Sequence, residues 1–221
     1  MLDRFLLPVV KSVLKPVAAA LARRGVGADG LTVAGFAIGL GAVPALALQF
    51  YGVALIAILV SRLFDALDGA VARLNGPTER GAFLDITLDF AFYGCIPLGF
   101  ALADPARNAL PAAVLLAAFM GTGSSFLAFA VIAAKRGLTS EVYPQKGIYY
   151  LTGLTEGAET IAALALMCVF PGSFPIIAYV FAAACLVTTL TRLRQGWVVF
   201  ATPPPGTDEK PLQPTPPRDA G

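Results

Sequence analysis

Four aspartates lie within long apolar stretches of the chain. Asp65 and Asp68 fall in one stretch, and Asp85 and Asp89 fall in the next. A charge at the centre of a bilayer costs roughly 2.5–3.5 kcal/mol on insertion scales, so such residues need compensation. Their i,i+3 and i,i+4 spacings place each pair on one helix face. Because only a short segment near residues 75–80 joins the two stretches, we expect an antiparallel hairpin whose carboxylate pairs face each other near the membrane surface.

Carboxylates in this arrangement favour the chemistry of divalent cations. Four of them facing one another repel unless some are protonated or metal ions lie among them. The chain contains no histidine, and carboxylates without His or Cys suit hard cations such as Mg²⁺, Mn²⁺ or Ca²⁺. One or two such ions are a natural means of clamping phosphate oxygens. The aspartates therefore predict a metal site that binds a phosphorylated substrate.

The residues around the aspartates agree with a phosphate site. Gly69 and Ala72 are small and leave room beside the helix, and Arg73 on the same side can bind phosphate bidentately. Gly81 allows close approach where the next helix begins. The alternative for any one of the aspartates is an ion pair with Arg62 or Arg73, but these helices hold too few cations to pair all four.

Composition identifies the chain as an integral membrane protein. Of its 221 residues, 57% are hydrophobic and only 14% are charged, whereas soluble domains carry about 25% charged residues. This balance excludes a disordered protein, a nucleic-acid-binding protein and most cytosolic enzymes. Continuous apolar runs favour helices over a barrel, so we expect an all-α polytopic protein. The candidate transmembrane helices are six: 31–50, 52–73, 81–103, 108–134, 148–170 and 174–195.

Charge and composition predict how the chain is organised across the membrane. Every lysine and arginine except Arg107 falls on one side of the six spans. The positive-inside rule therefore predicts that both termini and the active site face the cytoplasm. Composition and orientation favour a bacterial inner membrane, with an organellar membrane as the alternative. Residues 1–25 are expected to form an interfacial amphipathic helix, or else the first turns of the first span. Residues 26–200 form the six-helix catalytic domain, and the Pro-rich residues 201–221 a disordered tail.

Small residues predict where helices pack closely. Gly35 and Gly39 form a small-xxx-small pair in the first span, and Gly121 and Gly123 lie in the fourth. Such residues let helix backbones approach one another in membranes.

The aspartate hairpin resembles the signature of the CDP-alcohol phosphotransferase family. The sequence Asp65-Ala-Leu-Asp68-Gly69-Ala-Val-Ala72-Arg73, seven residues, Gly81-Ala-Phe-Leu-Asp85-Ile-Thr-Leu-Asp89 matches the pattern D-x2-D-G-x2-A-R, seven or eight residues, G-x3-D-x3-D at every defining position. The likeness in layout covers roughly residues 1–195. Upstream, Ala28-Asp29-Gly30-Leu31-Thr32 resembles the family's A-N-x-x-T start of the first span. Here Asp29 replaces Asn, and it either caps the helix or contributes to the substrate site.

The resemblance implies an activity and a role for each matching residue. The family transfers a substituted phosphate from a CDP-linked alcohol to a second alcohol and releases CMP. By position, Asp65, Asp68 and Asp85 would hold metal, and Asp89 would bind a second metal and act as general base. The cofactor would be Mg²⁺ or Mn²⁺, as two ions, and the protein a homodimer. In most members the donor is CDP-diacylglycerol, a membrane lipid. The residues that would line the CDP site are Thr32, Asp65, Gly69, Ala72, Arg73 and Gly81.

The acceptor alcohol is less well defined. Phe90 follows the last aspartate, where several branches that use phosphorylated acceptors have Lys or Arg. Two acids in the fifth span could bind acceptor hydroxyls or an amine, or pair with arginines at the end of the last span. Those arginines could bind a phosphate, or simply anchor the helix by the positive-inside rule. Together these features favour an unphosphorylated polyol or amino alcohol. The candidate acceptor residues are Glu156, Glu159, Arg192 and Arg194.

Two other functions remain compatible with the sequence. One is an enzyme of the same chemistry that takes a soluble CDP-alcohol as donor and a lipid as acceptor. The other is a divalent-cation transporter that uses the aspartates as an ion path. Transporters usually place such groups near the midplane of the membrane, whereas here they lie near the cytoplasmic end, beside Gly69 and Arg73. That placement favours transfer chemistry.

Overall fold

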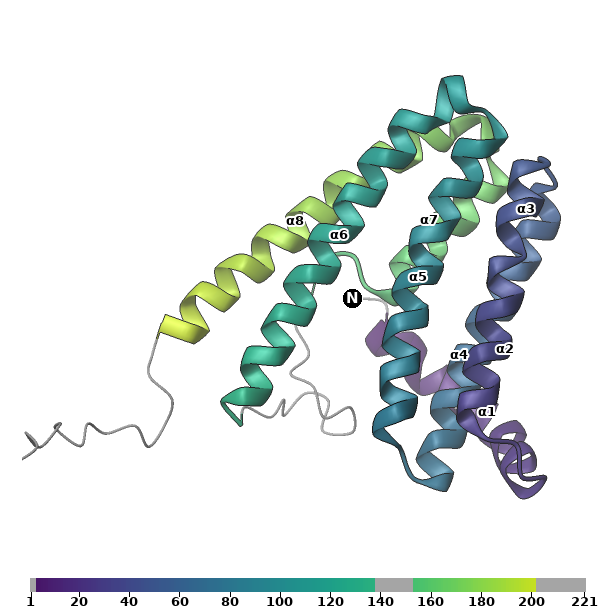
Figure 1. The fold of residues 1–221 in the computed structure, drawn as a ribbon, viewed down its shortest axis with the longest axis vertical. Helices are drawn as coiled ribbons and strands as arrows, with labels where there is room; N and C mark the ends of the chain where they lie inside the picture. The colour runs from purple at the N-terminus through teal and green to yellow at the C-terminus, as the bar shows by residue number, and fades with distance from the viewer. Residues whose placement is uncertain (1–2, 138–152, 202–221) are drawn as a thin grey trace, which may run out of the picture.

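The structure is a computed structural model that describes residues 3–137 and 153–201 (Figure 1). Its regular elements over these residues are all helices, which confirms the all-α fold class. In chain order they are α1 Asp3–Arg23, α2 Ala28–Leu40, α3 Ala42–Ala47, α4 Tyr51–Asn75, α5 Glu79–Ala103, α6 Pro105–Lys135, α7 Gly157–Val169, the short 3₁₀ helix η1 Pro171–Ser173 and α8 Phe174–Ala201.

Four helical stretches within the described residues are long and apolar enough to cross a membrane: Ala28–Ala47, Glu79–Ala103, Pro105–Lys135 and Pro171–Ala201. Helix α4 matches α5 in length, at 25 residues, but it carries Arg62 and two of the aspartates, which lower its hydropathy. Helix α7 has 13 residues, and the start of the span expected at 148–170 lies outside the described residues. The count of six spans therefore stays a prediction.

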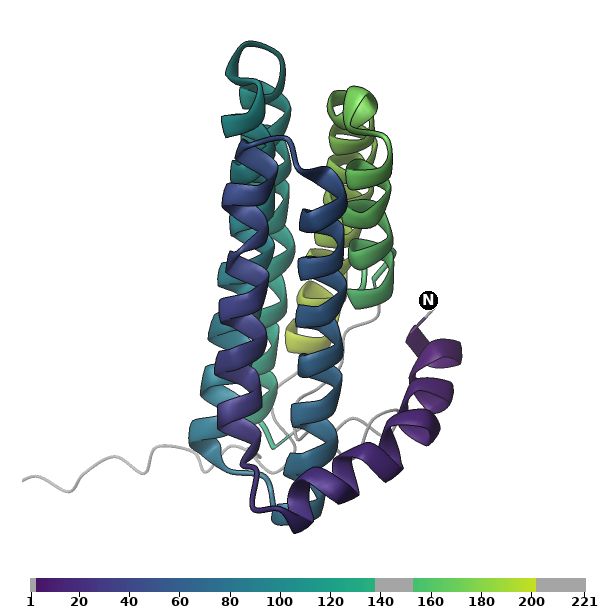
Figure 2. The same ribbon diagram turned by 90° about the vertical axis from the view of Figure 1, so that its right-hand side faces the viewer.

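The N-terminal helix packs against one end of the bundle. Leu14 and Ala18 of α1 are buried in a small core together with Leu31, Leu67 and Val71. Figure 2 shows α1 meeting the bundle at its lower end and inclining away from it. A helix is therefore present over the expected residues, while its position in the membrane interface stays a prediction. The disordered tail also stays a prediction, because most of residues 201–221 lie outside the described residues.

Helix α2 packs closely against both α4 and α5, and glycines make this possible. A Cβ added to Gly35 would lie 2.7 Å from the Cβ of Phe64, and one added to Gly39 would lie 2.6 Å from the hydroxyl of Ser61. In α6, a Cβ at Gly121 would lie 3.1 Å from the hydroxyl of Thr189 in α8. The close packing predicted from these small residues is confirmed.

The turn between α4 and α5 brings the two aspartate-bearing helices together as a hairpin. Gly76 has φ +92°, a conformation that L side chains rarely adopt. Thr78 is the N-cap of α5, and its hydroxyl accepts a hydrogen bond from the amide of Gly81 at 3.0 Å. The predicted hairpin is confirmed, and Figure 1 shows its turn at the lower end of the bundle.

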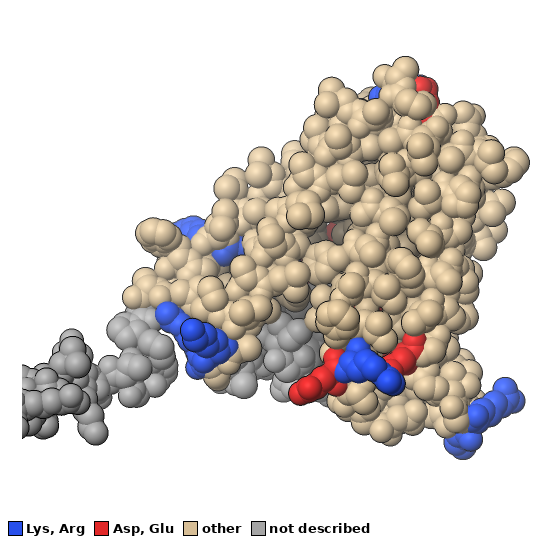
Figure 3. Space-filling view, in the orientation of Figure 1, with Lys and Arg blue, Asp and Glu red and all other residues tan. Residues whose placement is uncertain are grey.

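Charged side chains gather at that same end. In Figure 3 most of the visible lysines and arginines lie along the lower edge of the molecule, with little charge over the tan surface above them. The apolar surface is built from exposed side chains such as Met120, Ile176 and Val180, which are suited to contact lipid. This distribution matches the expected asymmetry, whereas which compartment the charged end faces stays a prediction.

Candidate active site

Three of the four aspartates converge. Asp65 and Asp68 come from α4 and Asp85 from α5, and one carboxylate oxygen of each lies within 4.8 Å of the other two. Asp68 is buried and the other two are half-buried. They line a small pocket between α2, α4 and α5. Its remaining lining residues are Thr32, Gly35, Phe36, Ser61, Arg62, Leu88 and Asp89.

The converging carboxylates fit a hard divalent cation. Three oxygens within 4.8 Å of one another can approach a common ion. Among the residues that the structure describes, Oδ2 of Asp68 is buried and has no hydrogen-bond partner. A buried charged oxygen without a partner is costly, and a bound cation would supply that partner. The donor set, all carboxylate oxygen, suits Mg²⁺ or Mn²⁺.

The fourth aspartate is held differently. Asp89 pairs with Arg62, whose Nη1 donates a hydrogen bond to Asp89 Oδ1. The same Nη1 lies 3.7 Å from Oδ1 of Asp65. One ion pair considered from the sequence is therefore formed, whereas Arg73 has no ion pair within the described ranges. The structure brings three of the four carboxylates together and places the fourth beside them on an arginine.

The expected nucleotide-binding residues lie in and next to this pocket. Thr32 lines the pocket from α2, and its hydroxyl donates to the carbonyl of Ala28 at 3.1 Å. On α4, Nη1 of Arg73 lies 3.4 Å from where a Cβ on Gly69 would be, so the exposed guanidinium reaches back over that glycine. Ala72 is half-buried on the last turns of the same helix, and Gly81 lies in the first turn of α5.

The N-cap interpretation of Asp29 is wrong. Helix α2 begins at Ala28 with Gly27 as its N-cap, and no side chain caps it. Asp29 instead pairs with Arg80, whose Nε donates a hydrogen bond to Asp29 Oδ2 at 2.8 Å and whose Nη2 lies 2.5 Å from the same oxygen. The pair joins the start of α2 to the start of α5. A local capping rule could not predict it, because the partner lies 51 residues away.

The sequence placed the two glutamates inside a span at 148–170, but helix α7 begins only at Gly157. Glu156 is the N-cap of α7 and Glu159 is its third residue, and their side chains form a capping box. Oε1 of Glu156 accepts from the amide of Gly153 at 3.1 Å, and Oε2 of Glu159 accepts from the amide of Glu156 at 3.2 Å. Their observed contacts therefore stabilise the start of α7, and an acceptor role stays a prediction.

The two arginines near the end of α8 differ from each other. Arg192 is buried, and its Nη1 donates to the carbonyl of Thr122 in α6 at 3.0 Å. Its guanidinium also lies 5.5 Å from the ring centre of Phe126. Arg194 is exposed. Arg192 therefore joins α8 to α6. A role for Arg192 and Arg194 in binding the acceptor stays a prediction.

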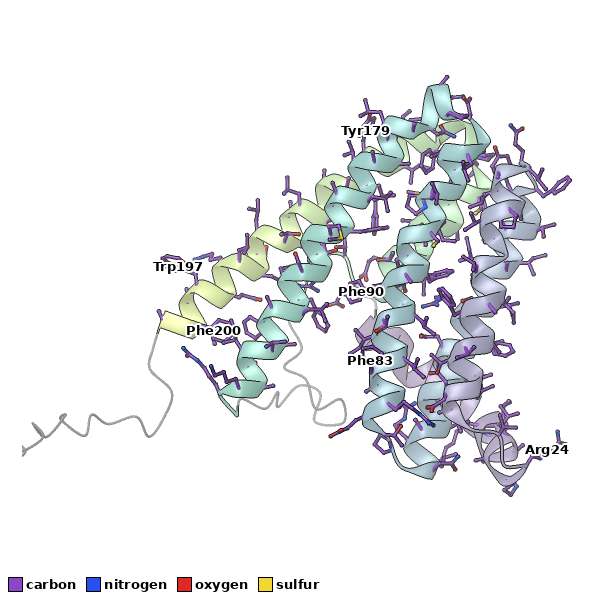
Figure 4. The ribbon with its side chains drawn as sticks, viewed as in Figure 1. Arg24, Phe83, Phe90, Tyr179, Trp197 and Phe200 are labelled. Carbon is purple, nitrogen blue, oxygen red and sulfur yellow. The ribbon has the colours of Figure 1, made fainter. Side chains whose placement is uncertain are left out.

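Phe90 lies between α5 and α6 (Figure 4). It packs against Gly123, where an added Cβ would lie 3.1 Å from Cδ1 of the ring. The absence of a side chain at Gly123 therefore leaves space for the ring of Phe90, the residue that follows the last aspartate.

Sequence analysis did not single out Ser61 as part of this site. It lines the pocket and is fully buried. The signal was available, because Ser61, Asp65 and Asp68 are spaced i, i+4 and i+7 on one helix face. Phe36 and Leu88 also line the pocket, but apolar residues in apolar spans carry no such signal.

A bundle of apolar helices around a carboxylate pocket, next to a glycine and an exposed arginine, is the arrangement expected of a membrane-embedded phosphotransferase. Residues 26–191 match the CDP-alcohol phosphatidyltransferase family. The chain therefore belongs to this family of transferases, as its aspartate signature predicted.

Comparison with known proteins identifies relatives in bacteria. The chain is 52% identical over 200 residues to the inner membrane protein YnjF of Escherichia coli, covering 90% of this chain and 97% of YnjF. It is 44% identical over 108 residues to the phosphatidylinositol phosphate synthase of Streptomyces avermitilis, covering 46% and 43% of the two chains. The apolar helices and the inner-membrane relative support a bacterial inner-membrane protein.

Solved structures share the fold. The crystal structure of Mycobacterium tuberculosis phosphatidylinositol phosphate synthase with CDP-DAG bound matches with a TM-score of 0.64 at 22% identity, covering 91% of this chain and 100% of that chain. The same enzyme in complex with manganese and citrate matches with a TM-score of 0.62 at 23% identity, covering 89% and 92%.

Proposed function

We propose that this protein transfers the phosphatidyl group of CDP-diacylglycerol to a small polar alcohol and releases CMP. The observation that carries the proposal is the convergence of Asp65, Asp68 and Asp85 within 4.8 Å of one another, in a family of phosphatidyltransferases. The relatives named above, one a phosphatidylinositol phosphate synthase and one a structure with CDP-DAG bound, support a lipid donor.

The proposed roles follow from position. Asp65, Asp68 and Asp85 would hold a Mg²⁺ or Mn²⁺ ion, which would supply positive charge to the diphosphate. The solved structure with manganese supports a metal of this kind. Thr32, Gly69, Ala72, Arg73 and Gly81 line the nucleotide side of the site. A second ion would require Asp89 as a ligand.

The reaction itself is a displacement at phosphorus. The acceptor oxygen forms a bond to the phosphorus that carries diacylglycerol, and the bond from that phosphorus to the CMP oxygen breaks. Asp89 takes the proton of the acceptor hydroxyl as general base. Arg73, exposed beside Gly69, stabilises charge on the departing CMP. We place this site on the cytoplasmic face, where CMP and the acceptor are water-soluble.

For the acceptor we propose an unphosphorylated polyol or amino alcohol. The side chain that follows Asp89 is the aromatic ring of Phe90, packed on Gly123, so no cation stands at that position. A phosphorylated acceptor is the second candidate, favoured by the relative named as a phosphatidylinositol phosphate synthase. In that case exposed Arg194, together with Arg192, would contact the phosphate.

A paired acceptor panel tests the proposal. Purified protein with CDP-diacylglycerol and Mn²⁺ is offered inositol and inositol phosphate, glycerol and glycerol 3-phosphate, and serine, and radiolabelled lipid product is measured. We expect product with an unphosphorylated alcohol and none with Asp89→Asn. Product only with the phosphorylated member of a pair would establish the second candidate.

The same panel separates the other functions. Product formed only when a soluble CDP-alcohol and diacylglycerol replace CDP-diacylglycerol would reverse the assignment of donor and acceptor. Uptake of Mn²⁺ into proteoliposomes, with no CMP released from any donor, would instead identify a cation transporter.

A further inference from the structure

Arg62 is the cation that the structure buries beside the carboxylates. Its side chain is 9% exposed. It lies in α4, which the sequence predicts as a membrane span, and arginine inside such a span is rare and requires compensation. The guanidinium contacts Asp89 and lies 3.7 Å from Asp65, so it shares one carboxylate with the triad. A divalent ion bound by the triad would therefore lie close to a fixed positive charge.

The position of Arg62 is set by groups other than the carboxylates. Its guanidinium carbon lies 4.1 Å from the ring centre of Phe92 and 5.3 Å from that of Tyr93. Its Nη2 donates to the hydroxyl of Ser61 at 3.2 Å. Two aromatic rings and a hydroxyl thus hold the guanidinium in place, so it is not free to leave when a cation arrives.

Helix α2 closes this arrangement from outside. A Cβ on Gly39 would lie 2.6 Å from Oγ of Ser61 and 2.7 Å from Cδ2 of Phe92. Only glycine lets α2 approach the two residues that hold Arg62. The bundle is therefore packed tightly around the arginine, as expected if its orientation matters for the site.

We propose that Arg62 is a positioning residue that fixes the carboxylate of Asp89 for the acceptor and weakens the binding of divalent cations by the adjacent triad. The proposal rests on the function proposed above. The guanidinium balances part of the negative charge of the carboxylates and orients Asp89. It would also repel a cation bound at Asp65 and so keep cation binding reversible.

The expected size follows from electrostatics. Nη1 of Arg62 lies 3.7 Å from Oδ1 of Asp65, and Mg²⁺ binds a carboxylate oxygen at about 2 Å, so the two charges would be at most about 6 Å apart. At that separation, even with the screening of bulk water, a single and a double positive charge repel enough to change binding about tenfold. Removing the charge of Arg62 should therefore tighten Mn²⁺ binding at least about tenfold while turnover falls. A merely structural role predicts that both decline together.

The test measures binding of Mn²⁺ alone to the purified full-length protein, by the electron paramagnetic resonance of free Mn²⁺, alongside CMP release. Arg62→Gln should bind Mn²⁺ more tightly and turn over more slowly, and Arg62→Lys should bind Mn²⁺ within about twofold of the wild type. Arg107→Gln, which removes the same charge at the start of α6, is the matched control and should change neither. If Arg62→Gln does not fold, Arg62→Met is the second neutral variant.

The outcomes separate the two proposals. In one outcome the wild type binds Mn²⁺, and Arg62→Gln or Arg62→Met binds it equally well or more weakly. That result would overturn the role of Arg62 and leave the transferase proposal intact. No Mn²⁺ binding by the wild type would overturn both, because the triad would then not be a metal site.

Discussion

Replacing Asp68 with asparagine should stabilise the metal-free protein and remove its response to metal. Asp68 is 4% exposed, and one of its oxygens has no hydrogen-bond partner among the described residues. Carboxylate oxygens of Asp65 and Asp85 lie within 4.8 Å. Two like charges at that distance repel by about 0.9 kcal/mol even with the screening of bulk water. Two such pairs give about 2 kcal/mol. This value is a lower bound on the repulsion, because a half-buried pocket screens charge less than bulk water does.

The assay is thermal unfolding of the detergent-solubilised protein at pH 8, in EDTA and in MnCl₂. In EDTA, Asp68→Asn should unfold at a temperature higher than the wild type by roughly 4–8 °C, the shift expected for about 2 kcal/mol in a chain of this size. Mn²⁺ should raise the unfolding temperature of the wild type, because it binds the folded state alone, and should have little effect on the variant.

A matched control separates this effect from a general loss of charge. Glu79→Gln removes one acid from the exposed first turn of α5, outside the triad, and should leave the Mn²⁺ response intact. The reasoning is refuted if Asp68→Asn is less stable than the wild type in EDTA, or if Mn²⁺ stabilises both proteins equally.

Three further substitutions test the packing around the site and the space beside Gly69. Gly39→Leu should destabilise the protein by about 1–3 kcal/mol through overpacking, since even a Cβ there would lie 2.6 Å from the Ser61 hydroxyl. Gly69→Ala should unfold at the wild-type temperature but release CMP more slowly, because its Cβ would contact only the end of the Arg73 side chain, at 3.4 Å. Thr188→Val should cost about 2–3 kcal/mol, because two amides before α7 donate to the buried Thr188 hydroxyl and would lose their acceptor. Equal unfolding temperatures for both glycine variants, or a stable Thr188→Val, would contradict the packing described.

The aspartate hairpin was predictable because its determinants are local. Asp65 and Asp68 share a helix face by their spacing. The segment after α4 is short, and Thr78 caps α5 by accepting from the amide of Gly81, so α5 must return beside α4. The small residues Gly35 and Gly39 likewise predicted where α2 packs. Spacing along one helix and the length of one turn sufficed for these features.

Other features depended on contacts between distant residues. The sequence offered Arg62 and Arg73 equally as partners of an aspartate, and the choice of Arg62 depends on the ring of Phe92 and on the approach of α2. The partner of Asp29 is Arg80, on another helix. No rule of spacing along the chain identifies such partners.

The start of α7 illustrates a third limit. Hydropathy extended the fifth span through Glu156 and Glu159, but the helix begins at Gly157 and both acids bind backbone amides. The usual signal for such a helix start is Ser, Thr, Asp or Asn followed three residues later by Glu or Gln, and Glu156 with Glu159 only approximates it. In a membrane protein that signal competes with the expectation that buried acids are functional.

The most direct test of the central claim is CMP release from CDP-diacylglycerol by the purified wild type and by Asp85→Asn, with the active acceptor present, in Mn²⁺ and in EDTA. We expect release by the wild type in Mn²⁺ and none in EDTA or by the variant. Undiminished release in EDTA, or by Asp85→Asn, would show that the converging carboxylates do not hold a cation on which the transfer depends.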